Sequence, residues 1–129
     1  MEKFDITVIG SGPGGYSAAL RCAAKGAKVA IIEKAQIGGV CLNCGCIPSK
    51  ALLASAHVFN LAKSASVFGV DIENPKINWP RMQAHKDNVV STLRKGLTGV
   101  ILNSKIKIFE GRGIAKSPTK IIVEGKVPA

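Results

Sequence analysis

With 129 residues, 47% of them hydrophobic and 20% charged, the chain has the size and composition of one soluble globular domain. It shows no apolar run near the ~18 residues of a membrane span and no basic leader, so we expect a cytoplasmic protein without membrane contact. The net charge of +10 would suit a nucleic-acid partner. The basic residues are scattered singly, however, and aromatic residues are few, so we expect a solvated basic surface and no nucleic-acid partner.

The first third of the chain predicts a βαβ unit. Residues 4–10 (FDITVIG) form a short apolar run, residues 16–27 are rich in small helix formers, and residues 28–33 (KVAIIE) form a second apolar run. A strand, a glycine turn, a helix and a strand in this order predict two parallel strands with a right-handed crossover.

Glycines in the turn have the spacing G-x-G-x-x-G, at Gly10, Gly12 and Gly15. They follow a predicted strand and precede a helix, and Glu33 ends the next strand about 20 residues on, as in dinucleotide-binding units. Gly10 permits the tight turn, Gly12 lets the backbone approach a pyrophosphate, and Gly15 lets the helix pack closely. The helix N-terminus would attract the diphosphate, and Glu33 would accept hydrogen bonds from the ribose hydroxyls. The alternative for Glu33 is an exposed carboxylate at a strand end.

The remaining segments predict two long helices and a group of short strands. On the second long helix, we expect one apolar face to lie in the core: Met82, Val89, Leu93, Leu97 and Val100. The predicted segments are a helix over 47–65, a loop over 67–78, a helix over 79–103, and short strands within 105–115 and 119–125.

The stretch GGVCLNCGCIPSK carries three cysteines, Cys41, Cys44 and Cys46. In the cytosol, clustered cysteines are more often redox-active or metal-binding than structural. A structural zinc site usually needs four ligands, commonly from two separated knuckles. Because Cys22 lies on another predicted element, we expect no metal.

Two redox pairings remain open from the residues alone. Cys41 and Cys44 have the C-x-x-C spacing of thioredoxin-like motifs. Cys41 and Cys46 are five residues apart, and on a regular α-helix their Cα atoms would be roughly 8.6 Å apart, beyond the ~7 Å that disulfides span. A bridge between them therefore requires a distorted segment, which Gly45 and Pro48 favour. Closing so short a loop would contribute only about 2 kcal/mol, so neither pairing is explained as a structural staple.

Two stretches, VIGSGPGGYSAALRCAAKGAKVAIIEK and GGVCLNCGCIPSKALL, closely resemble the flavoprotein disulfide reductases. The resemblance covers most of the chain and is strongest up to about Lys50. It implies that the redox-active cysteines are Cys41 and Cys46, which are separated by four residues. The family position of Cys44 is usually Val, so Cys44 would be an additional buried thiol. Val40 is often Thr in relatives, so a hydroxyl contact would be absent here.

The resemblance also implies that the βαβ unit binds FAD and not NAD. The fold class is then α/β: a Rossmann-like FAD-binding domain with a parallel sheet and a small antiparallel β-meander, incomplete in this chain. Cys46 would lie next to the isoalloxazine ring, Cys41 would attack the substrate disulfide, and Lys50 would stabilise negative charge on the flavin. Proximity to a helix N-terminus and a lysine would lower a thiol pKa here. The implied cofactor contacts are Gly10, Gly12, Gly14, Gly15, Glu33, Lys34, Gly39, Val40, Cys41, Lys50 and Gly113.

For activity, the resemblance implies the oxidation of protein-bound dihydrolipoamide, with electrons passing from the cysteines to FAD and then to NAD. The sequence IPSK favours this reaction over glutathione reduction, whereas mercuric reductase remains an alternative. An alternative from a different class is a thiol–metal binding module without turnover. The implied partners are a lipoyl-bearing acyltransferase of 2-oxoacid dehydrogenase complexes and, in the full-length enzyme, a second copy in a homodimer.

The family also has a second G-x-G-x-x-G motif, which binds NAD, and a His–Glu dyad that acts as acid and base. Neither occurs in the sequence. We therefore expect residues 1–129 to be the front part of an FAD-binding domain, with the NAD-binding and interface domains absent. Such a chain would bind FAD weakly and would have no lipoamide turnover alone.

Overall fold

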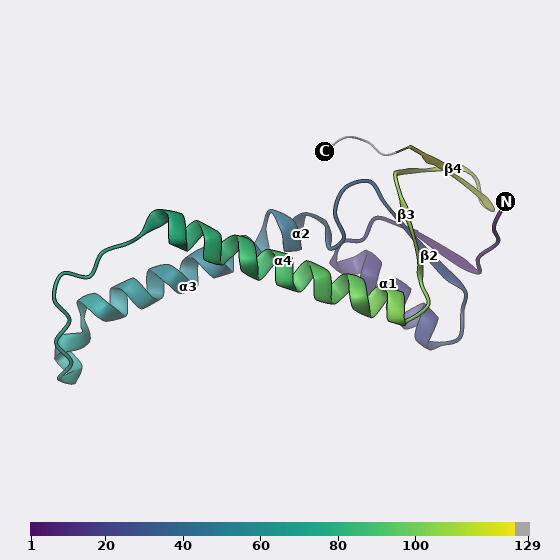
Figure 1. The fold of residues 1–129 in the computed structure, drawn as a ribbon. Helices are drawn as coiled ribbons and strands as arrows, with labels where there is room; N and C mark the ends of the chain where they lie inside the picture. Colours follow the sequence, from purple (N-terminus) through teal and green to yellow (C-terminus); the bar gives the residue numbers. More distant parts are fainter. Residues whose placement is uncertain (126–129) are drawn as a thin grey trace.

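The computed structural model describes residues 1–125 (Figure 1). A small sheet lies at one end, and a hairpin of two long helices, α3 and α4, extends away from it. The elements in chain order are β1 (Ile6–Ile9), α1 (Pro13–Ala24), β2 (Val29–Glu33), α2 (Gly39–Asn43), α3 (Cys46–Lys63), the 3-10 helix η1 (Ala65–Phe68), α4 (Trp79–Asn103), β3 (Lys107–Glu110), β4 (Arg112–Ser117) and β5 (Lys120–Glu124).

Strands β1, β2 and β3 form a parallel sheet with β2 in the centre. In this register Ile31 of β2 lies beside Val8 of β1 and Ile108 of β3. Every residue of β2 is buried, whereas both ends of β1 and β3 are exposed, because among the described strands only β2 has a neighbour on each side. Helix α1 joins β1 to β2, so the predicted βαβ unit is confirmed.

Strands β4 and β5 form a separate antiparallel hairpin. The segment over 105–115, expected among the short strands, is split at Gly111: its first half joins the parallel sheet as β3, and its second half is β4. Gly111 has φ of +144°, and a Cβ there would lie 2.4 Å from the carbonyl oxygen of Glu124. Glycine is therefore required where the chain leaves one sheet for the other. The fold class predicted from the sequence, a parallel α/β sheet with a small antiparallel part, is confirmed.

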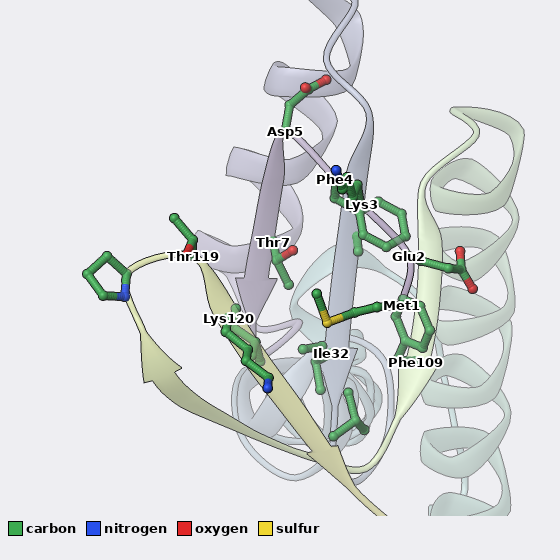
Figure 2. Close-up of a pocket in the computed structure, with 14 residues that line it drawn as sticks. Met1, Glu2, Lys3, Phe4, Asp5, Thr7, Ile32, Phe109, Thr119 and Lys120 are labelled. Atoms are coloured by element: carbon green, nitrogen blue, oxygen red, sulfur yellow. The ribbon is translucent and has the colours of Figure 1, made fainter.

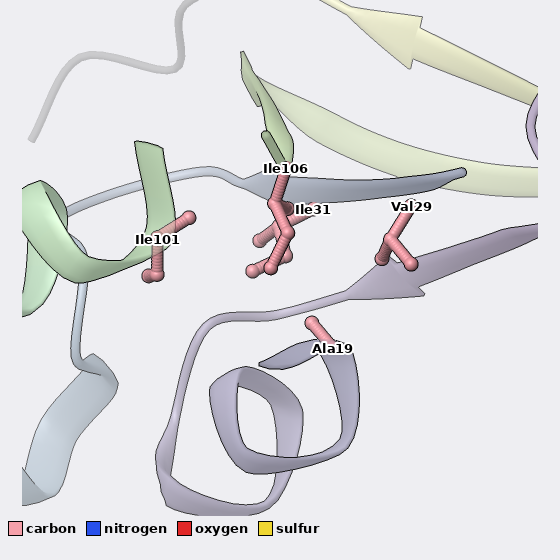
Figure 3. Packing of buried hydrophobic residues seen from close by; sticks show 5 residues of the cluster. All are labelled: Ala19, Val29, Ile31, Ile101 and Ile106. Atoms are coloured by element: carbon pink, nitrogen blue, oxygen red, sulfur yellow. The ribbon is translucent and has the colours of Figure 1, made fainter. Parts of the chain in front are cut away.

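The hydrophobic core lies between the sheet, α1 and the C-terminal end of α4 (Figure 3). The apolar face predicted for α4 is wrong in part, because Leu93 and Val100 are 44% and 52% exposed, whereas Val90 and Ile101 are buried. Only the last turns of α4 reach the sheet, and its earlier turns pack on α3 and α2, so much of the apolar surface stays uncovered. The central cluster consists of Ala19, Val29, Ile31, Ile101 and Ile106.

By length and composition, Gly39–Lys63 contains an 18-residue stretch that is apolar enough to cross a membrane, and 6% of this stretch is buried. The prediction that no such run exists is therefore wrong by this criterion. The segment is interrupted between α2 and α3, and it carries Lys50. Backbone breaks and charges are costly in a bilayer, and one such helix is weak evidence for a membrane contact.

Two neighbouring residues of α4 should contribute very differently to the stability of the fold. Ile101→Ala should lower the free energy of unfolding by about 2–5 kcal/mol, because Ile101 is fully buried and its removal leaves a cavity. Leu102→Ala on the same turn should change it by only about 0.5 kcal/mol, because Leu102 is 55% exposed. Urea unfolding followed by circular dichroism measures both values. Equal losses in the two variants would contradict the placement of α4.

Candidate functional site: a glycine-rich turn beside three cysteines

The glycine-rich turn joins β1 to α1 by a very close backbone path. Gly10 has φ of +94° and donates its N–H to the carbonyl oxygen of Ile32 at 2.8 Å. A Cβ on Gly15 would lie 2.0 Å from the carbonyl oxygen of Gly10, so α1 can approach β1 this closely only with glycine. A Cβ on Gly12 or Gly14, in contrast, would meet no atom within 4 Å. The backbone at the start of α1 is therefore open to a ligand.

Glu33 lies directly behind this turn, at the carboxyl end of β2. Its carboxylate accepts hydrogen bonds from the N–H of Ser11 at 2.8 Å, from Oγ of Ser11 at 2.7 Å and from the N–H of Ala35 at 3.0 Å. Burial acts to raise the pKa of Glu33, but these hydrogen bonds and one from the backbone of Lys34 outweigh it, so the pKa is lowered from its ordinary value of 4.5. Glu33 is thus buried and ionised near neutral pH, and the alternative of an exposed carboxylate is wrong.

Ser11, which the sequence analysis did not single out, also ties the turn to the cysteine segment. The N–H of Gly38 donates to the carbonyl oxygen of Ser11 at 3.1 Å and to its Oγ at 3.2 Å. Gly39 follows with φ of +63°, and a Cβ on it would lie 2.8 Å from Cα of Gly12. The segment that carries the cysteines therefore starts in direct backbone contact with the glycine-rich turn.

A break between two helices brings Cys41 next to Cys46. Cys41 lies on α2, α3 begins at Cys46, and the backbone between them leaves the helical path at Gly45, with φ of −121° and ψ of −103°. The break packs against Cys41, since a Cβ on Gly45 would lie 3.4 Å from Cα of Cys41, and the thiol of Cys46 is near enough to act on that of Cys41. All four cysteines are free thiols. The distortion that the sequence analysis required for such a contact is present. Cys44 lies at the break and is exposed, so the expectation of a buried thiol is wrong.

The contact between the two thiols changes the acidity of Cys41. The side chain of Cys46 raises the pKa of Cys41 above its ordinary value of 9.0, and desolvation adds to this. A hydrogen bond from the backbone of Cys46 and the charge of Lys50 lower the pKa by less. A hydrogen bond to the neutral thiol favours the protonated form. The expected lowering of a thiol pKa at this pair therefore does not hold for Cys41 in the dithiol form.

Three open grooves surround the sheet and the cysteines. One of about 800 Å³ lies beside Glu33 at the carboxyl ends of β2 and β3, where open α/β sheets bind ligands. A second of about 550 Å³ is mostly apolar and is lined by Cys41 together with Tyr16 and Leu97. The third, of about 740 Å³, lies between the β4–β5 hairpin and the sheet, and Figure 2 shows Thr7 and Ile32 on its floor. The second groove adjoins both the glycine-rich turn, at Pro13, and the cysteine segment, at Gly38 and Cys41.

The other residues predicted to contact a cofactor are placed less centrally. Lys34, Val40 and Lys50 are exposed, and among them Lys50 has an electrostatic effect on Cys41. A Cβ on Gly113 would lie 3.1 Å from Ile9, so packing on the sheet is sufficient to explain this glycine. Within residues 1–125, no three His, Cys, Asp or Glu side chains are grouped to hold a metal ion.

The parallel sheet and its glycine-rich turn define an α/β protein of the dinucleotide-binding type. The model of the family described as pyridine nucleotide-disulphide oxidoreductase matches residues 4–126, and the chain belongs to this family.

Curated relatives agree over nearly the whole chain. A dihydrolipoyl dehydrogenase of Chlamydia trachomatis is 50% identical over 99% of the chain and 28% of its own length. Proteins of the same name from Acholeplasma laidlawii and Geobacillus stearothermophilus are 40% and 46% identical, over 97% and 83% of the chain. The chain spans 38% of the Acholeplasma laidlawii relative and 23% of the Geobacillus stearothermophilus relative.

The buried carboxylate of Glu33 should make the free energy of unfolding depend on pH. Since the folded-state pKa of Glu33 is lowered, its ionised form stabilises the fold at pH values above 4.5, and this stabilisation is lost as the pH falls through the folded-state pKa. Glu33→Gln should lower the free energy of unfolding at pH 7, and the difference from the unsubstituted chain should shrink below pH 4.5. Urea titrations at pH 3 to 7 measure this difference. A difference that is constant over this range would contradict the ionised, hydrogen-bonded Glu33.

Proposed function

We propose that the chain is the FAD- and dithiol-bearing part of a flavin-dependent disulfide oxidoreductase that oxidises protein-bound dihydrolipoamide, with NAD as the final acceptor. The observation that carries the proposal is the helix break at Gly45, which places Cys46 beside Cys41 on a segment that packs against the glycine-rich turn. The name dihydrolipoyl dehydrogenase, shared by the relatives reported above, supports the substrate class. It also favours the lipoamide reaction over that of a mercuric reductase.

The residues around the turn suit FAD. The open backbone at Gly12 and Gly14 leaves room for a pyrophosphate at the start of α1, where N–H groups and the helix dipole favour anions. Glu33 is ionised at neutral pH and lies beside the groove at the end of β2, so it can accept a further hydrogen bond from a ribose hydroxyl. FAD held by these residues would supply a two-electron acceptor for the dithiol.

The chemistry of the pair is thiol–disulfide exchange. In the oxidised form, one thiolate of the substrate attacks Sγ of Cys41, which breaks the bond to Cys46 and releases the Cys46 thiolate. The second substrate thiol then attacks the mixed disulfide and releases Cys41. The substrate leaves as a disulfide, and the two electrons and two protons remain on Cys41 and Cys46. Cys44 takes no part in these two exchange steps.

The partners follow from the same proposal. The substrate dithiol belongs to a lipoyl-bearing acyltransferase of a 2-oxoacid dehydrogenase complex, and a homodimer completes the site in the full-length enzyme. A cytoplasmic location fits this role. The chain alone is proposed to bind FAD weakly and to lack lipoamide turnover.

A substitution at Gly12 tests the cofactor site. Gly12 has an extended backbone, with φ of −66° and ψ of 179°, and a Cβ on it would point away from Gly39 into open space, so Gly12→Val should leave the fold intact. The new side chain would occupy the position of the pyrophosphate and prevent its charge-assisted hydrogen bonds with the backbone. We therefore expect the affinity for FAD to fall at least roughly tenfold. Quenching of flavin fluorescence on titration with the chain measures this affinity.

Gly125→Val is the matched control, because Gly125 also has open space around it and lies at the end of β5. It should bind FAD as the unsubstituted chain does. Equal FAD affinity in Gly12→Val and Gly125→Val, or no FAD binding by the unsubstituted chain, would overturn the proposed cofactor site.

A further inference from the structure

Helix α2 carries Cys41 but is too short to hold its own position. It spans only Gly39–Asn43, and no side chain caps its N-terminus. It starts after a left-handed residue, Gly38, and ends at the break before Gly45. Because an isolated helix of this length is not stable in water, the position of Cys41 depends on contacts from outside α2.

Asn43 provides one such set of contacts. Its Nδ2 group donates to the carbonyl oxygens of Gly39 at 2.9 Å and Ile37 at 3.0 Å, with a longer contact of 3.4 Å to that of Gln36. The side chain at the end of α2 therefore binds the loop that leads into α2. This loop and the short helix become one closed unit.

Arg94 anchors this unit to the long helices. Its guanidinium Nη1 donates to Oδ1 of Asn43 at 3.1 Å and also to Oε1 of Gln36. Arg94 lies on α4, which packs along α3, and α3 begins with Cys46. The guanidinium thus connects the helix that carries Cys41 to the helical hairpin that carries Cys46. Hydrogen bonds from a charged donor are stronger than those between neutral groups.

We propose that Arg94 is a positioning residue for the dithiol: through Asn43 it holds α2 against the start of α3, so that Cys41 stays beside Cys46. Arg94 touches neither thiol, and it acts through the loop and Asn43. This role rests on the proposed function, because it explains how the same pair of thiols is held in place. The contact that it explains is present whether or not the pair turns over a substrate.

The test measures how readily the two thiols form a disulfide. In a background with Cys22→Ser and Cys44→Ser, only Cys41 and Cys46 remain, and a series of glutathione ratios gives the equilibrium constant of their disulfide. Arg94→Gln should lower this constant roughly 3–10-fold, the range of one net hydrogen bond. Arg94→Lys keeps the charge but lacks the planar guanidinium with its several donors, so it should give an intermediate equilibrium constant.

Lys95→Gln is the matched control. Lys95 is the next residue on α4 and lines the groove beside Glu33, as Arg94 does. Within residues 1–125 its side chain forms no hydrogen bond, and its substitution removes the same charge. It should change the equilibrium constant less than about twofold, below the effect of one hydrogen bond. Thermal unfolding shows whether each variant folds. If Arg94→Gln does not fold cooperatively, the same lowering of the disulfide equilibrium constant is sought in Arg94→Lys.

A second measurement separates positioning from general stability. The alkylation rate of Cys41 as a function of pH reports its pKa, which the contact with Cys46 holds above the ordinary value. This pKa should fall towards the ordinary value in Arg94→Gln and not in Lys95→Gln. An equilibrium constant and an alkylation profile that are unchanged in Arg94→Gln would overturn the positioning role. If even the unsubstituted chain forms no disulfide between Cys41 and Cys46, the proposed function fails, and the alkylation profile still decides the role of Arg94.

Discussion

Two close backbone contacts determine the arrangement of the rest of the site. Gly15 lies against Gly10, which holds α1 on β1, and Gly39 lies against Gly12, which holds the cysteine segment on the turn. A Cβ at Gly15 or Gly39 would come within 2.0 Å or 2.8 Å of backbone atoms. Since backbone cannot move aside as a flexible side chain can, these contacts exist only with glycine. They place the start of α1, Glu33 and the cysteines around one turn.

Local signals predicted most of the fold from the sequence, and long-range contacts decided the rest. The βαβ unit and both long helices follow from apolar spacing and turn residues, and the structure confirms them. The sequence did not separate β3 from β4, because the difference depends on the partner of each strand and not on its own residues. Likewise, Leu93 and Val100 fit an apolar helix face, but the hairpin leaves that face without a covering element.

The candidate site was predictable to a similar degree. The positions of the glycines, Glu33 and the three cysteines are visible as motifs, whereas Ser11, Asn43 and Arg94 are not. The partners of these three side chains include residues 22, 27, 51 and 58 positions away, so no local spacing reveals them. For the cysteines, spacing left two pairings open, and the break at Gly45 brings Cys46 to Cys41. The exposure of Cys44 could not be read from its motif either.

The central claim is that the helix break selects Cys41 and Cys46, and not the C-x-x-C pair, as the redox couple. The most direct test is a disulfide map of the whole chain after mild oxidation, with free thiols blocked at low pH and the peptides identified by mass spectrometry. The account predicts that the bridge between Cys41 and Cys46 predominates and that Cys44 is recovered with the blocking group. A map dominated by a bridge between Cys41 and Cys44, or between Cys44 and Cys46, would contradict it.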